Sequence, residues 1–398
     1  MTSTTAPSRH ATVGRIAGRL STTLAYRGLE LARRTSPSSA AEAPSSAGAV
    51  TAEWLTDALG RDVPGARVAG FTTASATSQT TSRASLRLHW TDAGVAAGLP
   101  EEVFVKLTAT ARQRLFLGLI RCIEGEPLFY REIRPLLDIE CPEGYHGVVD
   151  ERSWRSAVVI EDIAATRGAT FCHATTAVGR PDIESLLEVM AGYHGAMWQS
   201  PAITEAPWLK RPIDHFHNTS AFLNMRKRVA VGVQRTAGLV PPRVRDDADG
   251  LWSAFLASME QCSTGPATLL HGDPHVGNTY RTPGGTMALL DWQVCMQGSW
   301  GFDYAYAVST ALTVADRRAW EDDLLAFYLE RLALAGGDPP EFEAAKRVYR
   351  QCLMYPFHTW TTVIGRSAVQ PLMQEEDVCR LIVERVAQAI DDLDAVHA

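Results

Sequence analysis

The order of secondary-structure patterns along the chain constrains its fold more than any other feature. Before residue 163 the sequence holds short β-prone runs between turn-rich stretches. After residue 167 apolar residues recur at helical spacing, interrupted by one β-rich island at 269–292. The predicted strands are 68–71, 85–90, 103–107 and 157–160, and the predicted C-terminal helices are 183–197, 221–231, 247–262, 317–334, 341–354 and 375–396. This order predicts an α+β fold with a small β-rich N-terminal lobe and a larger helical C-terminal lobe that carries one hairpin.

Two helices are also predicted in the N-terminal half. Thr51 is a suitable N-cap for a helix that contains Trp54 and Leu55. The stretch 115–137 is mostly helical in pattern, and Pro127 within it must lie at a helix start or at a kink.

Composition excludes several classes of protein. The 398 residues are 46% apolar and 21% charged, an ordinary globular balance for a chain long enough to form two lobes. A net charge of −7 argues against nucleic acid as a partner, because duplex binding needs a basic surface. No run of eighteen apolar residues predicts a transmembrane helix. Seven scattered cysteines without a C-x-x-C pair predict reduced, buried thiols in a cytoplasmic protein.

The first fifty residues differ from the rest. Residues 1–40 contain six arginines and one acid, Glu30, and apolar residues recur there at helical spacing. The segment could be a poorly ordered extension, a helix resting on the body, a helix that contacts an anionic membrane surface through residues 11–34, or a segment similar to a transit peptide. A Ser/Ala/Pro-rich linker follows. The predicted domains are therefore the extension and linker (1–50), the N-lobe with its hinge (51–163) and the C-lobe (164–398).

The β-rich island contains the residues suited to chemistry. It reads H-G-D-P-H-V-G-N from position 271 and L-D-W-Q from position 290. Phosphoryl transfer requires that the acceptor hydroxyl be aligned, that its proton be accepted, and that phosphate charge be neutralised by Mg²⁺ and cationic groups. Carboxylate and amide oxygens are suitable Mg²⁺ ligands. Asp273 as the base, with Asn278 and a hairpin-borne Asp291 at the metal, fits these needs.

This pair of motifs, with the second aspartate eighteen positions after the first, resembles the aminoglycoside phosphotransferase and choline kinase superfamily, and most closely its ecdysteroid-kinase-like branch. The resemblance extends to a G-x-x-x-x-D-x-A segment containing Asp303, to segments around Lys106, Glu126 and Glu161, and to most of the chain after residue 51. It implies a bilobal protein-kinase-like fold, ATP and Mg²⁺ as cofactors, and a small-molecule hydroxyl group as the acceptor.

The resemblance also implies roles for residues of the island and the helix after it. Asp273 is the catalytic base, and Asn278 and Asp291 bind Mg²⁺. Asp303 ties the catalytic loop to the following helix. Two other interpretations of the motif stay open: its acids could be ordinary turn residues, or its two histidines and Asp273 could bind zinc in a metal-dependent hydrolase.

For the nucleotide, the resemblance implies that Lys106 contacts the α- and β-phosphates and pairs with an acid on the next helix, most directly Glu126. Glu124 and Glu132 are alternative partners. The backbone from Glu161 to Ile163 is expected to form the hinge that binds adenine.

The stretch 72–82, expected as the loop between the first two strands, lacks the glycine that the family usually carries there. Glycine lets backbone N–H groups approach phosphate closely. Hydroxyl groups, among them that of Ser78, are predicted to contact phosphate instead. Alternatively the loop touches nothing, which would suit a non-catalytic nucleotide-binding protein of the same fold.

The acceptor is the least determined part of the prediction. The C-terminal helices carry many aromatic residues, including Trp300, Tyr355, Phe357 and Trp360, and no dense acidic cluster that would neutralise a polycationic substrate. The sequence therefore predicts a kinase for a hydrophobic or moderately polar small molecule. The oligomeric state and the choice between ATP and GTP stay open.

Overall fold

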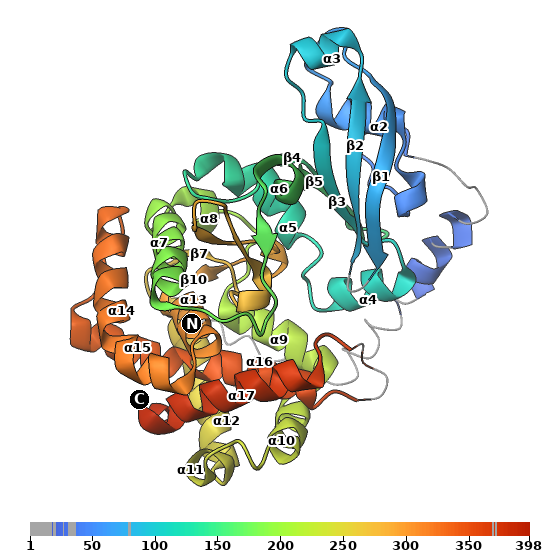
Figure 1. The fold of residues 1–398 in the computed structure, drawn as a ribbon. Coiled ribbons are helices and arrows are strands. Elements are labelled where there is room, and N and C mark those ends of the chain that lie inside the picture. Colours follow the sequence, from blue (N-terminus) through green and yellow to red (C-terminus); the bar gives the residue numbers. More distant parts are fainter. Residues whose placement is uncertain are drawn as a thin grey trace. The chain divides into compact units, whose positions relative to one another are not determined.

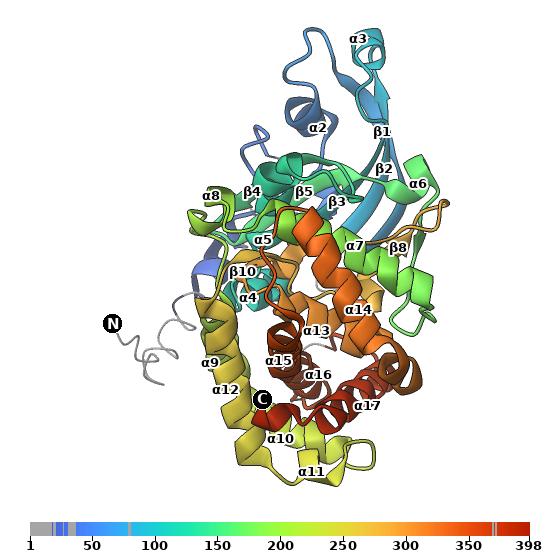
Figure 2. The same cartoon turned by 90° about the vertical axis from the view of Figure 1, so that its left-hand side faces the viewer.

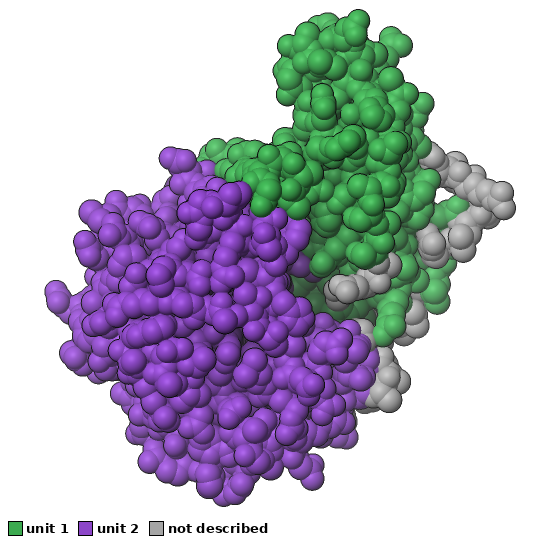
Figure 3. All heavy atoms as spheres, viewed as in Figure 1, with its two compact units in different colours: residues 1–136, 142–168 green, residues 137–141, 169–398 purple. Residues whose placement is uncertain are grey.

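The computed structural model describes residues 18, 21–26, 28–30, 37–78, 81–367, 370 and 372–398. The chain divides into two compact units, coloured separately in Figure 3. Unit 1 comprises residues 1–136 and 142–168, and unit 2 comprises residues 137–141 and 169–398. The division at residue 168 follows closely on the expected hinge.

Unit 1 is built on a five-stranded antiparallel sheet with the strand order β1-β2-β3-β5-β4 (Figure 1). The strands are β1 (Val68–Ser78), β2 (Ser82–Trp90), β3 (Glu102–Leu107), β4 (Gly144–Asp150) and β5 (Arg155–Glu161). Four of them contain the predicted strands. The edge strand β4 was not predicted, because its Gly-, His- and Asp-containing sequence has neither an apolar run nor a clear alternation.

The expected loop at 72–82 is wrong in its extent. The strand β1 continues to Ser78, and its register with β2 runs to the pair Ser78↔Ser82. Threonine is a good strand former, and the run of Thr and Ser residues continues the sheet with bulges rather than leaving it.

A helix and the preceding segment cover one face of this sheet. Helix α2 (Ala52–Leu59) begins at the predicted N-cap, since the Thr51 side chain accepts a hydrogen bond from the Trp54 backbone N–H. Trp54 and Leu55 pack on apolar side chains of the sheet, and the Trp54 indole N–H donates to the Glu42 carbonyl at 3.0 Å. Ala43 is also buried in this core. The expected linker is thus packed in the described residues 37–50, because its small side chains fit beside the sheet.

The predicted helix at 115–137 is divided into four segments, the last of which is a 3-10 turn at Arg134–Leu136. Helix α4 (Ala111–Leu119) starts with a capping box between Thr110 and Gln113. A break follows, then helix α5 (Gly125–Leu128) and a π-helical turn at Phe129–Ile133. Pro127 lies in the first turn of α5, where its missing N–H removes no intrahelical bond. Two short helices, α3 (Asp92–Ala96) and α6 (Ile163–Arg167), complete unit 1.

The described part of the N-terminal extension is helical at residues 18, 21–26 and 28–30 and is bonded to unit 1. Glu30 forms a bidentate ion pair with Arg114 of α4, with Oε1 and Oε2 at 2.8 and 2.9 Å from the guanidinium nitrogens. Arg114 is fully buried and also donates to the Thr108 carbonyl, which follows β3. Most of the segment proposed for membrane contact lies outside the described residues.

Unit 2 is mainly helical (Figure 2). Its helices are α7 (Arg180–Ala196), α8 (Pro201–Thr204), α9 (Pro212–Leu223), α10 (Met225–Arg235), α11 (Pro242–Arg245), α12 (Ala248–Thr264), α13 (Gly301–Ala311), α14 (Val314–Leu334), α15 (Phe342–Cys352), α16 (Met354–Ile364) and α17 (Glu376–Asp392). The predicted helix at 221–231 is wrong in its bounds, because Asn224 adopts a left-handed conformation and separates α9 from α10.

The β-rich island forms short strands that hold the predicted site. A three-stranded sheet has the order β6-β8-β9, and a separate pair joins β10 to β7. The bounds are β6 (Thr170–Phe171), β7 (Thr268–Leu270), β8 (Thr279–Arg281), β9 (Met287–Leu289) and β10 (Met296–Gly298). The loop between β7 and β8 contains the H-G-D-P-H-V-G-N motif.

Candidate active site

The β8–β9 hairpin brings two predicted metal ligands to one end. Thr279 pairs with Leu289, and the backbone N–H of Leu290 donates to the Asn278 carbonyl at 2.9 Å. Asn278 precedes β8 and Asp291 follows Leu290, so both lie at the open end of the hairpin. Asp291 has a φ of 67°, a left-handed conformation that ends the strand and turns the chain.

The predicted base, Asp273, lies in the loop beside Asn278 and is held on both oxygens. The Tyr306 hydroxyl donates to Oδ1 at 2.6 Å. The Asn278 side-chain N–H donates to the Asp273 carbonyl at 2.9 Å and to Oδ2 at 3.2 Å, and His275 Nε2 lies 3.8 Å from Oδ2. The Asp273 side chain is 32% exposed, so a hydroxyl group can reach it.

Asp303, at the start of α13, fixes the backbone of the same loop. Its carboxylate accepts hydrogen bonds from the backbone N–H groups of His271 at 2.6 Å and Gly272 at 2.9 Å, and from the Tyr193 hydroxyl at 2.8 Å. Burial raises the pKa of Asp303, but the adjacent His194 and the loop amide outweigh this effect and the pKa lies below its usual value. The structure thus gives Asp303 the loop-tying contacts that the resemblance implied.

Both histidines of the motif bond within the protein. His271 Nε2 lies 3.0 Å from the Leu290 carbonyl, while its Nδ1 accepts from the Asp273 backbone N–H at 3.3 Å. Burial lowers the pKa of His271, so its ring is neutral near pH 7. His275 Nδ1 accepts from the Gly277 N–H at 3.0 Å. These bonds fix the loop, and they engage both ring nitrogens of His271 and Nδ1 of His275.

The donor set at the open end of the hairpin fits Mg²⁺. Asn278 turns its NH₂ group toward Asp273, which leaves its amide oxygen as the group that can face a cation. Asp291 adds a carboxylate. Within the described residues no group of three or more His, Cys, Asp and Glu side chains could form an all-protein metal cage. Two oxygen ligands are what Mg²⁺ typically takes from a protein when phosphates and water complete its coordination.

In unit 1, Lys106 of β3 and Glu126 of α5 form a buried ion pair. Lys106 Nζ lies 2.6 Å from Glu126 Oε2, and the two side chains are 5% and 6% exposed. Val105 and Leu107 face the core under α2, so Lys106 between them faces the opposite side of the sheet. Of the alternative partners, Glu132 pairs with Arg131 instead.

The expected hinge joins β5 to α6. The Glu161 carboxylate accepts hydrogen bonds from the Thr166 hydroxyl at 2.6 Å and from the Arg167 guanidinium at 2.8 Å. Burial raises the pKa of Glu161, but Arg167 and Thr166 more than offset this and the pKa is lowered. Asp162 caps α6, whose first residue is Ile163. Because the Glu161 side chain is engaged, only backbone groups of this segment are suited to adenine.

The predicted contact of the Ser78 hydroxyl with phosphate depends on a side chain that the structure does not describe. Ser78 is the last residue of β1, and the structure describes its backbone but not its side chain. Residues 79 and 80 are also outside the described part.

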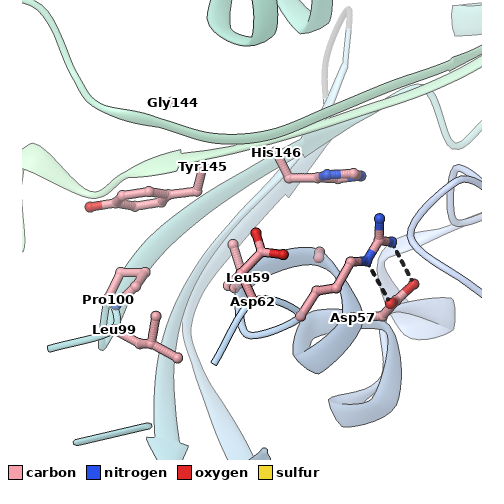
Figure 4. A pocket seen from close by; sticks show the side chains of 10 residues that line it. Asp57, Leu59, Asp62, Leu99, Pro100, Gly144, Tyr145 and His146 are labelled. Atoms are coloured by element: carbon pink, nitrogen blue, oxygen red, sulfur yellow. Dashed lines mark hydrogen bonds and ion pairs between the residues drawn. The ribbon is translucent and has the colours of Figure 1, made fainter. Parts of the chain in front are cut away.

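Unit 1 has a hollow of about 340 Å³ on the α2 side of the sheet (Figure 4). Tyr145 and His146 of β4 lie along one side of it, opposite Asp57 and Asp62. Arg61 also lines the hollow, and its guanidinium lies 3.0 Å from the Asp57 carboxylate. Burial, followed by the charges of Glu161 and Glu143, raises the pKa of Tyr145 to about 12. The hollow lies on the face opposite Lys106 and contains none of the predicted nucleotide residues.

The sequence profile of the phosphotransferase enzyme family matches residues 123–345, more than half of the chain and the whole of the motif region. The chain belongs to this family. Phosphoryl transfer, predicted from the motifs, is therefore the chemistry of its family, and ATP and Mg²⁺ are the cofactors of such phosphotransferases. No curated protein matches the chain. The finer resemblance to the ecdysteroid-kinase-like branch stays a prediction.

Several solved structures are similar to the chain. A candidate aminoglycoside phosphotransferase from Ralstonia eutropha has a TM-score of 0.52 at 12% identity, over 86% of this chain and 96% of its own. A macrolide 2'-phosphotransferase from Brachybacterium faecium has a TM-score of 0.41 at 18% identity, over 74% and 84%. A choline kinase from Streptococcus pneumoniae has a TM-score of 0.41 at 14% identity, over 82% of this chain and 94% of its own. The first confirms the predicted α+β protein-kinase-like fold.

Sequence reasoning missed one residue that touches the predicted base. Tyr306 lies three positions after Asp303, so both face the catalytic loop from one side of α13. The signal was present in this spacing, but it has meaning only once Asp303 is known to bond the loop.

Among the described residues, no helix is long and apolar enough to cross a membrane.

Proposed function

We propose that this phosphotransferase family member is a kinase that moves the γ-phosphate of ATP to a hydroxyl group of an apolar or moderately polar small molecule. The observation that carries the proposal is the placement of Asp273. Its carboxylate is partly exposed, is oriented by two hydrogen-bond donors, and lies beside Asn278, one of the two proposed metal ligands.

Asp273 is the proposed catalytic base. Its carboxylate orients the acceptor hydroxyl and receives the hydroxyl proton. The acceptor oxygen forms a bond to the γ-phosphorus as the bond to the ADP oxygen breaks, and the electron pair of that bond stays on ADP. Positioning of the two substrates supplies most of the rate enhancement, because the phosphoryl group passes through a loose transition state and forms no covalent bond to the protein.

The nucleotide residues are proposed in unit 1. Lys106, held by Glu126, donates hydrogen bonds to the α- and β-phosphates, and the backbone from Glu161 to Ile163 binds adenine. A role for Ser78 at the phosphates stays part of the proposal. Mg²⁺ held by Asn278 and Asp291 would neutralise phosphate charge during transfer.

The acceptor class is proposed from the side chains that pack near Asp273 in unit 2. The Trp360 ring meets the His275 ring edge-on at 5.3 Å between centroids. Tyr355 packs against Tyr306 at 5.8 Å and against Phe302 at 4.0 Å. Aromatic surroundings favour an apolar part in the acceptor, whereas a polycationic acceptor would need carboxylates there.

An acceptor screen tests this proposal. Purified protein with ATP and Mg²⁺ is offered apolar alcohols, sugars, amino alcohols and aminoglycosides, and product mass is measured. The expected result is the gain of one phosphoryl group on an apolar or moderately polar alcohol, lost when EDTA is added. Transfer to aminoglycosides alone would contradict the acceptor class. ATP binding without transfer to any acceptor would favour the non-catalytic alternative.

A further inference from the structure

Helix α13 contacts the catalytic loop at two points one turn apart. Asp303 bonds the loop backbone, and Tyr306 bonds the Asp273 side chain. The helix is buried at every residue from Gly301 to Ala311. It packs among α7, α14, α15, α16 and α17 of unit 2, as Figures 1 and 2 both show. A side chain on such a helix has little freedom to move, so the Tyr306 hydroxyl is held in one place.

The Tyr306 hydroxyl is a donor to Asp273. Its side chain is fully buried, and burial, with the negative charge of Asp273 next, raises the pKa of Tyr306 well above its ordinary value. The phenol therefore keeps its proton, and a carboxylate has only acceptor atoms to offer it. A hydrogen bond of 2.6 Å to a carboxylate falls in the charge-assisted class, which is stronger and more directional than a neutral one.

The two oxygens of Asp273 have different surroundings. Oδ1 bonds to the fully buried Tyr306, whereas Oδ2 has the longer contacts, 3.2 Å to Asn278 Nδ2 and 3.8 Å to His275 Nε2. Fixing Oδ1 also fixes the rotation of the carboxylate plane. This leaves Oδ2 as the oxygen that an acceptor hydroxyl can approach in a constant direction.

We propose that Tyr306 is a positioning residue, which orients the Asp273 carboxylate so that Oδ2 receives the proton of the acceptor hydroxyl. The inference rests on the proposed kinase function. It assigns to α13 a second role beside the backbone bonds of Asp303: the helix sets both the path of the loop and the rotation of the base.

The test is Tyr306→Phe, which removes one oxygen atom and keeps the ring. With the acceptor found in the screen, kcat should fall about 10–100-fold, the range for a lost hydrogen bond to a charged group. The KM for ATP and the KM for the acceptor should each stay within about two-fold, because neither substrate contacts the lost hydroxyl in this proposal. A rise in the acceptor KM with kcat unchanged would overturn it, since the hydroxyl would then bind the acceptor.

Tyr304→Phe is the matched control. Tyr304 lies on the same helix, is equally buried, and directs its hydroxyl to the Glu321 carbonyl at 3.5 Å rather than to the loop. This variant loses the same oxygen atom from the same core, so kcat should stay within about two-fold of wild type. If both variants lose the same amount of kcat, the loss in Tyr306→Phe comes from core packing, and the inference is overturned.

A double-mutant cycle separates positioning from a general structural role. If Tyr306 acts through Asp273, then adding Tyr306→Phe to Asp273→Asn should change the residual rate by less than about two-fold. Independent, multiplying effects would overturn the inference. If the wild-type protein transfers phosphate to no acceptor, both the proposed function and this inference are wrong. An active wild type with a fully active Tyr306→Phe variant would overturn the inference alone.

Discussion

Burial fixes the protonation states of several ionisable side chains in unit 2. His271 and His194 are fully buried, and burial lowers the pKa of each. Tyr193 and Tyr328, whose hydroxyl groups bond Asp303 and His194 respectively, have pKa values raised well above normal by burial. The imidazoles of His271 and His194 are therefore neutral near pH 7, and the phenols of Tyr193 and Tyr328 keep their protons.

His358 of α16 permits a direct test of this effect on stability. Its ring is fully buried and stacked on Phe255 at 4.2 Å, and burial lowers its pKa to about 4. An unfolded His titrates near pH 6.5, so between about pH 6.5 and 4 the unfolded chain binds more protons than the folded one. The free energy of unfolding should therefore decrease as the pH is lowered from about 6.5 to 4. This group contributes up to about 1.4 kcal/mol per pH unit to the decrease.

Urea unfolding at several pH values, for wild type and His358→Phe, measures this contribution. Phenylalanine keeps the ring on Phe255 but cannot take up a proton, so the variant should lose less stability between pH 6.5 and 4 than wild type does. Identical pH slopes for the two proteins would contradict the assigned burial of a neutral imidazole.

At the residue scale, the sequence predicted the site residues that belong to its motifs. It missed a residue that only the fold brings into contact with them. Asp273, Asn278 and Asp291 could be named because they lie close in sequence on one loop and one hairpin. The Lys106–Glu126 pair followed from the resemblance. Tyr306 could not be found, because its contact with Asp273 joins positions 33 residues apart.

At the element scale, two of the helices that the sequence missed, α13 and α16, are almost entirely buried. A helix that is apolar all round gives no amphipathic period. Helix α13 has every residue from Gly301 to Ala311 buried, and most of α16 is buried as well. By contrast α7, α12, α14, α15 and α17 each keep an exposed side and lie close to their predicted bounds.

The position of α5, and with it Glu126, depends on a close approach to β4. A Cβ atom built on Gly147 of β4 would lie 2.1 Å from the Pro127 carbonyl oxygen, a backbone atom that cannot rotate away. Gly147→Ala should therefore displace α5 or β4, with a loss of about 1–3 kcal/mol of unfolding free energy. Because Glu126 precedes Pro127, ATP affinity should also fall.

Gly70→Ala is the control for this variant. Gly70 lies in β1 of the same sheet, and a Cβ built there has no heavy atom within 4 Å. The control should stay within about 1 kcal/mol of wild type in unfolding and should bind ATP as wild type does. Nucleotide titration and thermal unfolding measure both quantities, and equal behaviour of the two variants would refute the packing argument.

At the scale of the whole molecule, the N-terminal extension proves to be part of unit 1 in its described residues. The sequence could not predict this, because Glu30 and Arg114 are 84 residues apart and neither belongs to a motif. Arg114 is fully buried, and a buried guanidinium needs a charged partner. The predicted boundary at residue 163 was drawn from the change from β to helical patterns in the sequence.

Removing the Glu30 carboxylate should destabilise unit 1. Glu30→Ala leaves Arg114 buried without this partner, and the expected loss is about 3–5 kcal/mol of unfolding free energy. Asp249→Ala is the control, because it breaks an exposed pair with Arg226 at 2.8 Å and should cost at most about 1 kcal/mol. If the two variants unfold alike, the extension does not stabilise unit 1 through this pair.

The central claim is that this protein is a kinase whose base is Asp273. The most direct measurement is the rate of phosphoryl transfer by Asp273→Asn relative to wild type, with ATP affinity measured on the same samples. The asparagine keeps the size of the side chain and removes its basicity, so kcat should fall about 10²–10⁴-fold while the Kd for ATP stays within about three-fold. A variant that keeps more than about a tenth of wild-type turnover would contradict the assignment of Asp273 as the base.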